Sequence, residues 1–137
     1  MIVYQKEIVI KTKHVYDFID ITDDIKKILK DSGIKNGLLS LFSLHNTACL
    51  IIQEYDKTIF KDIIEFFDRI LPLDKKYHHD YEGNINATAH IKSNLLSQSL
   101  NIPIKDGNLV LGTWQRIIFI ELFEPRDRKI FVTILGE

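Results

Sequence analysis

Residues 99–135, SLNIPIKDGNLVLGTWQRIIFIELFEPRDRKIFVTIL, hold the pattern that decides the fold. Short apolar segments alternate in this stretch with turn signals. Segments 102–104 and 109–111 flank Lys-Asp-Gly-Asn at 105–108, where Asp-Gly is a strong signal for a tight turn. This first part of the stretch therefore predicts a β-hairpin.

Two more strands are predicted later in the same stretch, at residues 115–123 and 128–135. The segment Glu-Pro-Arg-Asp at 124–127 joins them and favours a turn. Strands joined by short hairpins pair antiparallel. The C-terminal half of the chain therefore predicts a largely antiparallel sheet.

The first half of the chain alternates strand and helix signals. Residues 2–12 alternate apolar and polar side chains, as strands do. Residues 20–32 place isoleucines and a leucine on one helical face, with Thr22 as a candidate cap. The apolar runs 38–44 and 48–52 predict two further strands.

The clearest helix covers residues 56–71, where isoleucine, leucine and phenylalanine recur at spacings of three and four. Asp56 is a candidate cap, and Pro72 prevents the helix from continuing. Residues 73–89 are polar and predict a long loop, and residues 90–98 predict a short helix. A polar loop of that length inside a domain is usually functional or flexible.

These elements predict one α+β domain over residues 1–137, because the repeated βαβ units of a parallel sheet are absent. The composition is 45% hydrophobic and 27% charged with a net charge of -1, and no basic face that would favour nucleic acid is evident. No apolar run approaches the roughly 20 residues of a membrane span. The N-terminal segment lacks the apolar core of a signal peptide, and one cysteine allows no intrachain disulfide, so we expect a cytoplasmic protein.

Four of the five histidines lie between residues 45 and 90, in polar breaks of the apolar pattern. His45 follows a predicted strand, His79 lies in the long loop, and His90 opens the predicted short helix. Neutral imidazole is the commonest protein ligand of zinc, and a catalytic zinc site needs three protein ligands and one open position. Convergence of these three histidines would satisfy that need. The alternative is that they are exposed or hydrogen-bonding histidines, since no short metal motif such as HExxH is present.

Further candidates stand beside the histidines, each with a structural alternative. Glu54 ends an apolar run and is a candidate general base, or else a solvated charge. Trp114 and Gln115 follow a glycine and form a candidate ligand wall, although Trp114 is equally suited to core packing. Arg126 and Arg128 offer two guanidinium groups to a phosphate or carboxylate, or form surface ion pairs.

Several segments together identify a resemblance to the YjbQ-like family, often called secondary thiamine-phosphate synthase. The matching segments cover essentially the whole chain. The most specific one runs from Ser99 through IPIKDG to GTWQ at 112–115. The others are His45-Asn46-Thr47-Ala48, Gln53-Glu54 with Asp56, HHDYEG at 78–83, Ala89-His90-Ile91-Lys92, and Pro125-Arg126-x-Arg128 with the closing Leu135-Gly136-Glu137. The chain departs from the family at Asn46, where threonine is common, at Gln53, where asparagine is common, and at Thr88, where many members have a second histidine.

The resemblance implies a small α+β protein that forms a homotrimer. It implies that His45, His79 and His90 bind a divalent metal ion, usually zinc. It also implies an activity that joins hydroxymethylpyrimidine diphosphate to a thiazole phosphate and releases pyrophosphate.

Three functions follow from the residues and the resemblance together. In the first, an enzyme, Arg126, Arg128, Thr47 and Trp114 bind a small phosphorylated substrate, and Glu54 or Gln115 orients the reacting group. The second is a metal-assisted hydrolase of a small phosphorylated compound, which needs one substrate instead of two. The third is a trimer that binds a small ligand without turnover.

Overall fold

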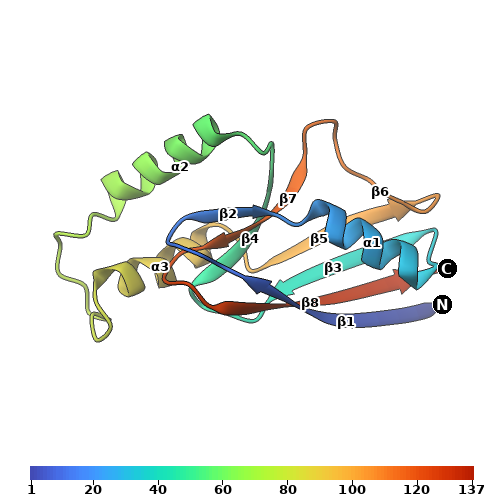
Figure 1. Ribbon diagram of the computed structural model, residues 1–137, viewed down its shortest axis with the longest axis horizontal. Helices are drawn as coiled ribbons and strands as arrows, with labels where there is room; N and C mark the ends of the chain where they lie inside the picture. The colour runs from blue at the N-terminus through green and yellow to red at the C-terminus, as the bar shows by residue number, and fades with distance from the viewer.

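Eight strands and three helices make up residues 1–137 in the computed structural model (Figure 1), and every pair of strands is antiparallel. The α+β class is therefore confirmed. No helix is long and apolar enough to span a membrane. The elements are β1 (Ile2–Lys11), β2 (Asp17–Asp20), α1 (Thr22–Ser32), β3 (Gly37–Ser43), β4 (Ala48–Gln53), α2 (Lys57–Ile70), α3 (Asn84–Leu95), β5 (Ser99–Lys105), β6 (Asn108–Leu109), β7 (Arg116–Glu121) and β8 (Asp127–Gly136).

The strands form two antiparallel sheets. One has five strands in the order β1-β8-β3-β5-β6, and the other has three in the order β2-β7-β4. The main core lies between the two sheets and α1, where Leu39 and Leu41 of β3 meet Ile25 of α1 and Phe119 of β7. Alternate residues of β3 point into this core, which explains the alternating burial of that strand.

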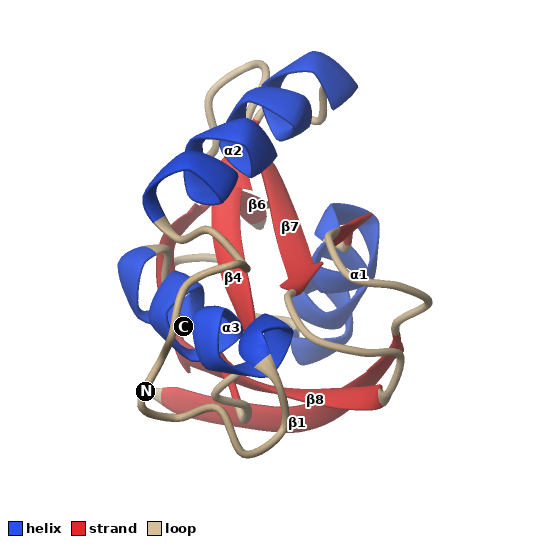
Figure 2. Ribbon diagram, turned by 90° about the vertical axis from the view of Figure 1, so that its left-hand side faces the viewer, coloured by secondary structure: helices blue, strands red, loops and turns tan.

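The three-stranded sheet is buried on both of its faces. Ile117 and Phe119 of β7 face the main core, whereas Ile118 and Ile120 join a second core with Phe60 of α2. Figure 2 shows α2 and α3 on one side of β4 and β7, with α1 on the other side. Burial on both faces explains why β7 has a continuous apolar sequence in place of an alternating one.

The structure corrects the predicted boundary of the third helix. The helix α3 begins at Asn84, six residues before the predicted start, so His90 lies in its middle. The segment has no apolar period because its buried side chains are small or polar, among them Asn86 and Thr88. The Asn84 side chain donates two hydrogen bonds of 2.8 Å to carbonyl groups of the preceding loop and holds that loop against the helix.

Two smaller predictions are also corrected. The short strand β2 was not predicted. Thr22 does not cap α1: its backbone N–H and hydroxyl both donate to Asp20 Oδ1, and its hydroxyl accepts from the backbone of Ile117. The predicted cap of α2 is confirmed, since the Asp56 side chain accepts a hydrogen bond of 2.7 Å from the backbone of Thr58.

Candidate functional site

A polar pocket of about 260 Å³ lies where the loop after β3 meets α3 and the turn between β7 and β8. We call it the histidine pocket. It is lined mainly by residues 44–47, Glu82, Asn86, His90, Arg126 and Arg128. In Figure 1 these elements gather at the end of the molecule opposite the two chain ends. The pocket contains a single apolar lining residue, Leu44, so its chemistry is that of polar side chains.

The loop 44–47 is fixed by hydrogen bonds to its carbonyl groups. Ser93 of α3 donates to the carbonyl of Asn46 at 2.5 Å, and Gln98 donates to that of His45 at 3.1 Å. The backbone N–H of Leu122 donates to the carbonyl of Thr47 at 3.1 Å. Three separate segments, α3, the residue before β5 and the residue after β7, therefore hold the backbone of the loop.

His45 is held in one tautomer. The backbone N–H of Lys129 donates to its Nε2 at 2.7 Å, so Nε2 carries the lone pair and Nδ1 carries the proton of the neutral ring. Burial lowers the pKa of His45 below its usual value, and the guanidinium of Arg128 lowers it further, against an opposing effect of Glu121. A neutral His45 therefore contributes an N–H donor at Nδ1.

His79 and His90 lie side by side. Their ring centroids are 4.6 Å apart at an angle of 71°. Burial lowers the pKa of His90, and the neighbouring His79 lowers it further. Asn86 lies one helical turn before His90 and is 3% exposed, and its Oδ1 has no hydrogen-bond partner.

The pocket rests on a buried ion pair between Arg128 and Glu121, which are 1% and 0% exposed. Arg128 Nε donates to Glu121 Oε1 at 2.7 Å, and its Nη2 contacts Glu121 Oε2 and the hydroxyl of Thr47. Burial would raise the pKa of Glu121, but hydrogen bonds from Arg128, Thr12 and the backbone of Phe123 hold it below its usual value. Arg128 is therefore fixed in the wall of the pocket, in contrast to a surface arginine.

Arg126 has the opposite character. Its side chain is 44% exposed and pairs with Glu124, while its guanidinium lies 5.2 Å from the centre of the Phe123 ring. An exposed pair of this kind contributes little stability. Arg126 can therefore exchange Glu124 for an anionic ligand at small cost.

The side chains do not fit the three-histidine metal site that the resemblance implies. No group of three or more His, Cys, Asp or Glu side chains in the chain is placed to hold a metal ion. The single lone pair of His45 is engaged by Lys129, so this ring has no free ligand atom in its neutral form. His79 and His90 are the two imidazoles that are adjacent.

The predicted catalytic residues Glu54 and Gln115 lie away from the histidine pocket of the same chain. Glu54 comes directly after Gln53, and Gln115 comes directly before Arg116; Gln53 and Arg116 are paired at one end of the β4–β7 ladder. The pair at the other end of this ladder, Ala48–Glu121, adjoins the pocket. The two pairs are separated by about 17 Å at roughly 3.3 Å per residue. Gln115 accepts a hydrogen bond of 2.7 Å from the backbone of Gly112, and the neighbouring Trp114 is 71% exposed.

Sequence reasoning missed Asn86 and the part played by Glu121. Glu121 stands inside the apolar run at 117–122, and a charged residue in such a run signals a buried partner. Asn86 precedes His90 by four residues, a spacing that becomes informative once the helix is known to start at Asn84.

The fold and the pocket define a class of small α+β proteins with two antiparallel sheets and a polar pocket at one end of the larger sheet. The family model described as UPF0047 protein YjbQ-like matches residues 6–137, and the chain belongs to this family. It is 39% identical over 137 residues to the UPF0047 protein YjbQ of Salmonella typhimurium, covering 98% of this chain and 99% of the relative.

Solved structures agree with this assignment. A YjbQ-like protein of unknown function from Sulfolobus solfataricus superposes with a TM-score of 0.92 at 35% identity, covering 98% of each chain. A protein of the same family from Clostridium acetobutylicum superposes with a TM-score of 0.85 at 41% identity, covering 98% of this chain and all of the other. The resemblance read from the sequence is therefore confirmed as family membership.

Proposed function

We propose that the histidine pocket binds the phosphate of a small phosphorylated molecule. The observation that carries this proposal is that three side chains of its lining have protons to donate, beside the one carboxylate of Glu82. Arg126 offers a guanidinium in a weak surface pair, His45 offers the Nδ1 proton, and Thr47 keeps a hydroxyl proton to donate. Charge-assisted bonds from arginine to phosphate oxygens are among the strong hydrogen bonds of proteins.

The finer proposal is a transferase that resembles secondary thiamine-phosphate synthase. In that reaction a bond forms between the pyrimidine and thiazole precursors, and pyrophosphate leaves with the electron pair of the broken bond. Negative charge accumulates on the leaving group, which is where fixed donors lower a barrier. We infer that Arg126 and His45, which both line the pocket, would stabilise that charge, with Arg128 positioning Thr47.

The pocket of one chain is small. Its volume of about 260 Å³ is below the roughly 300 to 1,000 Å³ of ordinary ligand pockets. A condensation needs two substrates, so the second would lie outside this cavity. In the homotrimer that the resemblance implies, a neighbouring subunit would supply the wall against which the second substrate lies.

The outer face of the five-stranded sheet supports that assembly. Val3, Leu135, Leu38 and Pro103 stand in one row across four neighbouring strands, since each is paired with the next. Val3, Leu38 and Leu135 are 58%, 40% and 36% exposed. A continuous exposed apolar row of this kind marks an interaction surface. Leu38→Lys is expected to give monomers in analytical ultracentrifugation, whereas trimers of that variant would count against this face as the contact.

The proposal includes a divalent metal ion, such as zinc, with His79 and His90 as its protein ligands. Two adjacent neutral imidazoles are suitable ligands, and the remaining positions would be filled by water or substrate. His90→Ala is expected to lose bound metal in elemental analysis, and His45→Ala is expected to retain it. Loss of metal from both variants would show that His45 leaves Lys129 to bind the ion.

The phosphate proposal is tested by calorimetric titration with inorganic pyrophosphate. Arg126→Gln is expected to weaken binding about tenfold, which is the usual effect of losing one charged hydrogen bond. Arg69→Gln is the matched control, because Arg69 is an exposed arginine on α2 outside the pocket. Equal affinities for the two variants would refute a phosphate site at Arg126.

Product analysis with both thiamine precursors then separates catalysis from binding. If the protein is the transferase, thiamine phosphate is expected only when both precursors are present. Non-catalytic binding is the second candidate, favoured by the position of Glu54 and Gln115 outside the pocket. Tight binding of a precursor without any product on long incubation would support that candidate.

A further inference from the structure

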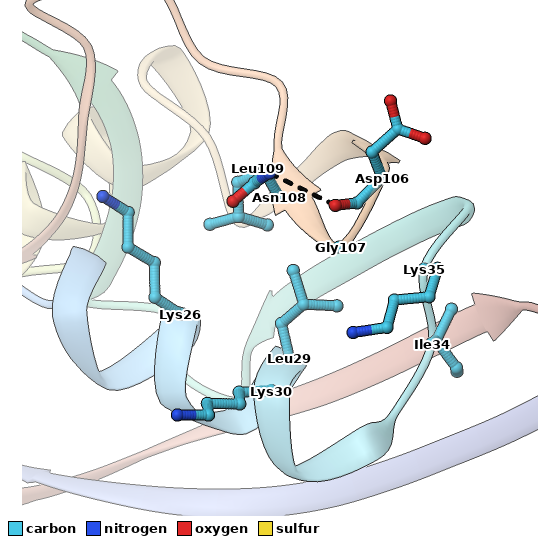
Figure 3. Close-up of a pocket in the computed structure, with 9 residues that line it drawn as sticks. All are labelled: Lys26, Leu29, Lys30, Ile34, Lys35, Asp106, Gly107, Asn108 and Leu109. Atoms are coloured by element: carbon cyan, nitrogen blue, oxygen red, sulfur yellow. Dashed lines mark hydrogen bonds between the residues drawn. The ribbon is translucent and has the colours of Figure 1, made fainter.

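A second cavity lies at the opposite end of β3 from the histidine pocket. Its volume is about 490 Å³, within the usual range of ligand pockets, and we call it the lysine cavity. It opens between α1, the segment that enters β3 and the β5–β6 hairpin (Figure 3). β3 spans seven residues, so the two sites are about 20 Å apart along the strand.

The rim of the lysine cavity carries uncompensated positive charge. Lys26, Lys30 and Lys35 line it together with a single carboxylate, that of Asp106. None of the three lysines takes part in the ion pairs of the protein, so no carboxylate lies within 4.0 Å of their amino groups. Lys26 and Lys30 are one turn apart on α1, where like charges repel. A bound anion would remove this repulsion.

Lys35 is positioned by the hairpin turn. Asp106 and Gly107 have φ angles of 51° and 80°, as a tight two-residue turn requires, and Gly107 N–H donates to the carbonyl of Lys35 at 2.8 Å. A Cβ at Gly107 would lie 3.2 Å from Cδ and 3.4 Å from Nζ of Lys35. The Lys35 side chain therefore lies against the turn. In Figure 3 its amino group points across the cavity toward Leu29.

The floor of the cavity is apolar. Leu29 and Ile34 belong to the main core and are 2% and 1% exposed, and Leu109 is half-buried beside them. A cavity with an apolar floor and a cationic rim is complementary to a molecule that has a hydrocarbon or ring body and an anionic group. Inorganic ions match the rim alone, and neutral apolar molecules match the floor alone.

We propose that the lysine cavity is a second binding site, separate from the histidine pocket, for a small organic phosphate with an apolar body. The phosphate lies beside Lys35, and the flexible side chains of Lys26 and Lys30, whose amino groups point away from Lys35 in Figure 3, turn to meet it. The apolar part of the ligand covers Leu109, which is the accessible part of the floor. A phosphate monoester carries about −1.5 to −2 charges at neutral pH, which matches the excess of three lysines over one aspartate.

The test is a titration of the full chain with phenyl phosphate, followed by the NMR shifts of backbone amides. We expect saturable shifts at Lys30, Lys35 and Gly107, with tighter binding than for inorganic phosphate or phenol. The triple variant Lys26→Gln/Lys30→Gln/Lys35→Gln is expected to bind at least about tenfold more weakly. The control Lys57→Gln/Lys61→Gln/Lys76→Gln removes the same charge from exposed lysines elsewhere and is expected to bind normally.

Three results would overturn the proposal. An equal loss of affinity in the control would show a general charge effect. Phenol binding as tightly as phenyl phosphate would show that the lysines take no part. Shifts confined to amides around His45 and Arg126 would assign the phosphate to the histidine pocket alone, which leaves the proposed function supported and removes the second site.

Discussion

The two ends of β3 carry two sites with cationic side chains, and the sites are built in opposite ways. At the histidine pocket the charge is buried: Arg128 and Glu121 are almost fully enclosed and bonded to each other. At the lysine cavity the charges stand in solvent above an apolar floor. A buried ion pair must be satisfied for the domain to fold, whereas exposed charges can be changed at little cost. Substitutions of the buried pair at the histidine pocket therefore lower the stability of the fold, whereas substitutions at the lysine cavity leave it almost unchanged.

The sharpest way to break this comparison is to remove one partner of the buried pair. Arg128→Met leaves the Glu121 carboxylate without a counter-charge, and we expect a loss of about 3–5 kcal/mol in the free energy of unfolding, measured in urea. Arg126→Met, in the neighbouring exposed pair, is expected to cost at most about 1 kcal/mol. Similar losses in the two variants would mean that burial does not distinguish the two arginines.

Acid supplies a second, smaller effect at the same end. The folded-state pKa of Glu121 is held below its usual value of 4.5. The stabilisation is therefore complete above pH 4.5 and is lost as pH falls through the folded pKa. As pH falls from 5 to below 4.5, stability measured by calorimetry should therefore fall more steeply in the parent protein than in Glu121→Gln. Parallel slopes would show that Glu121 does not contribute.

The smallest effect is expected at the lysine cavity. The triple variant Lys26→Gln/Lys30→Gln/Lys35→Gln should change the free energy of unfolding by no more than about 0.5 kcal/mol, as is usual for surface substitutions. Removing the repulsion between Lys26 and Lys30 should by itself raise the free energy of unfolding slightly. A loss above about 1 kcal/mol would give these lysines a structural role and weaken the comparison.

Much of the fold follows from local pattern, and the exceptions have physical causes. The apolar runs at 38–44 and 48–52 locate β3 and β4 within a residue or two. The start of α3 was missed because that helix buries Asn86 and Thr88 instead of an apolar stripe. Propensity and period carry no signal for a helix whose buried face is polar.

The candidate site was likewise predicted only in part from the sequence. The polar breaks in the apolar pattern predicted that His45, His79 and His90 converge. His45 and His90 line one pocket, and the ring of His79 lies beside that of His90. The burial of Arg128 depends on Glu121 across the β7–β8 turn, and no local pattern encodes that pairing. The position of Glu54 depends on strand register, since it extends from the far end of β4. Whether Glu54 and Gln115 act in catalysis stays a prediction.

One exposed side chain has a practical consequence for all of these measurements. Trp114 is the single tryptophan of the chain and is 71% exposed in the folded protein. Its fluorescence should change little when the cores melt, because the indole is already hydrated. It should respond instead when something covers the loop at 110–115. Emission spectra of this chain are therefore suited to detecting docking, and a backbone signal such as far-ultraviolet dichroism is needed to follow unfolding.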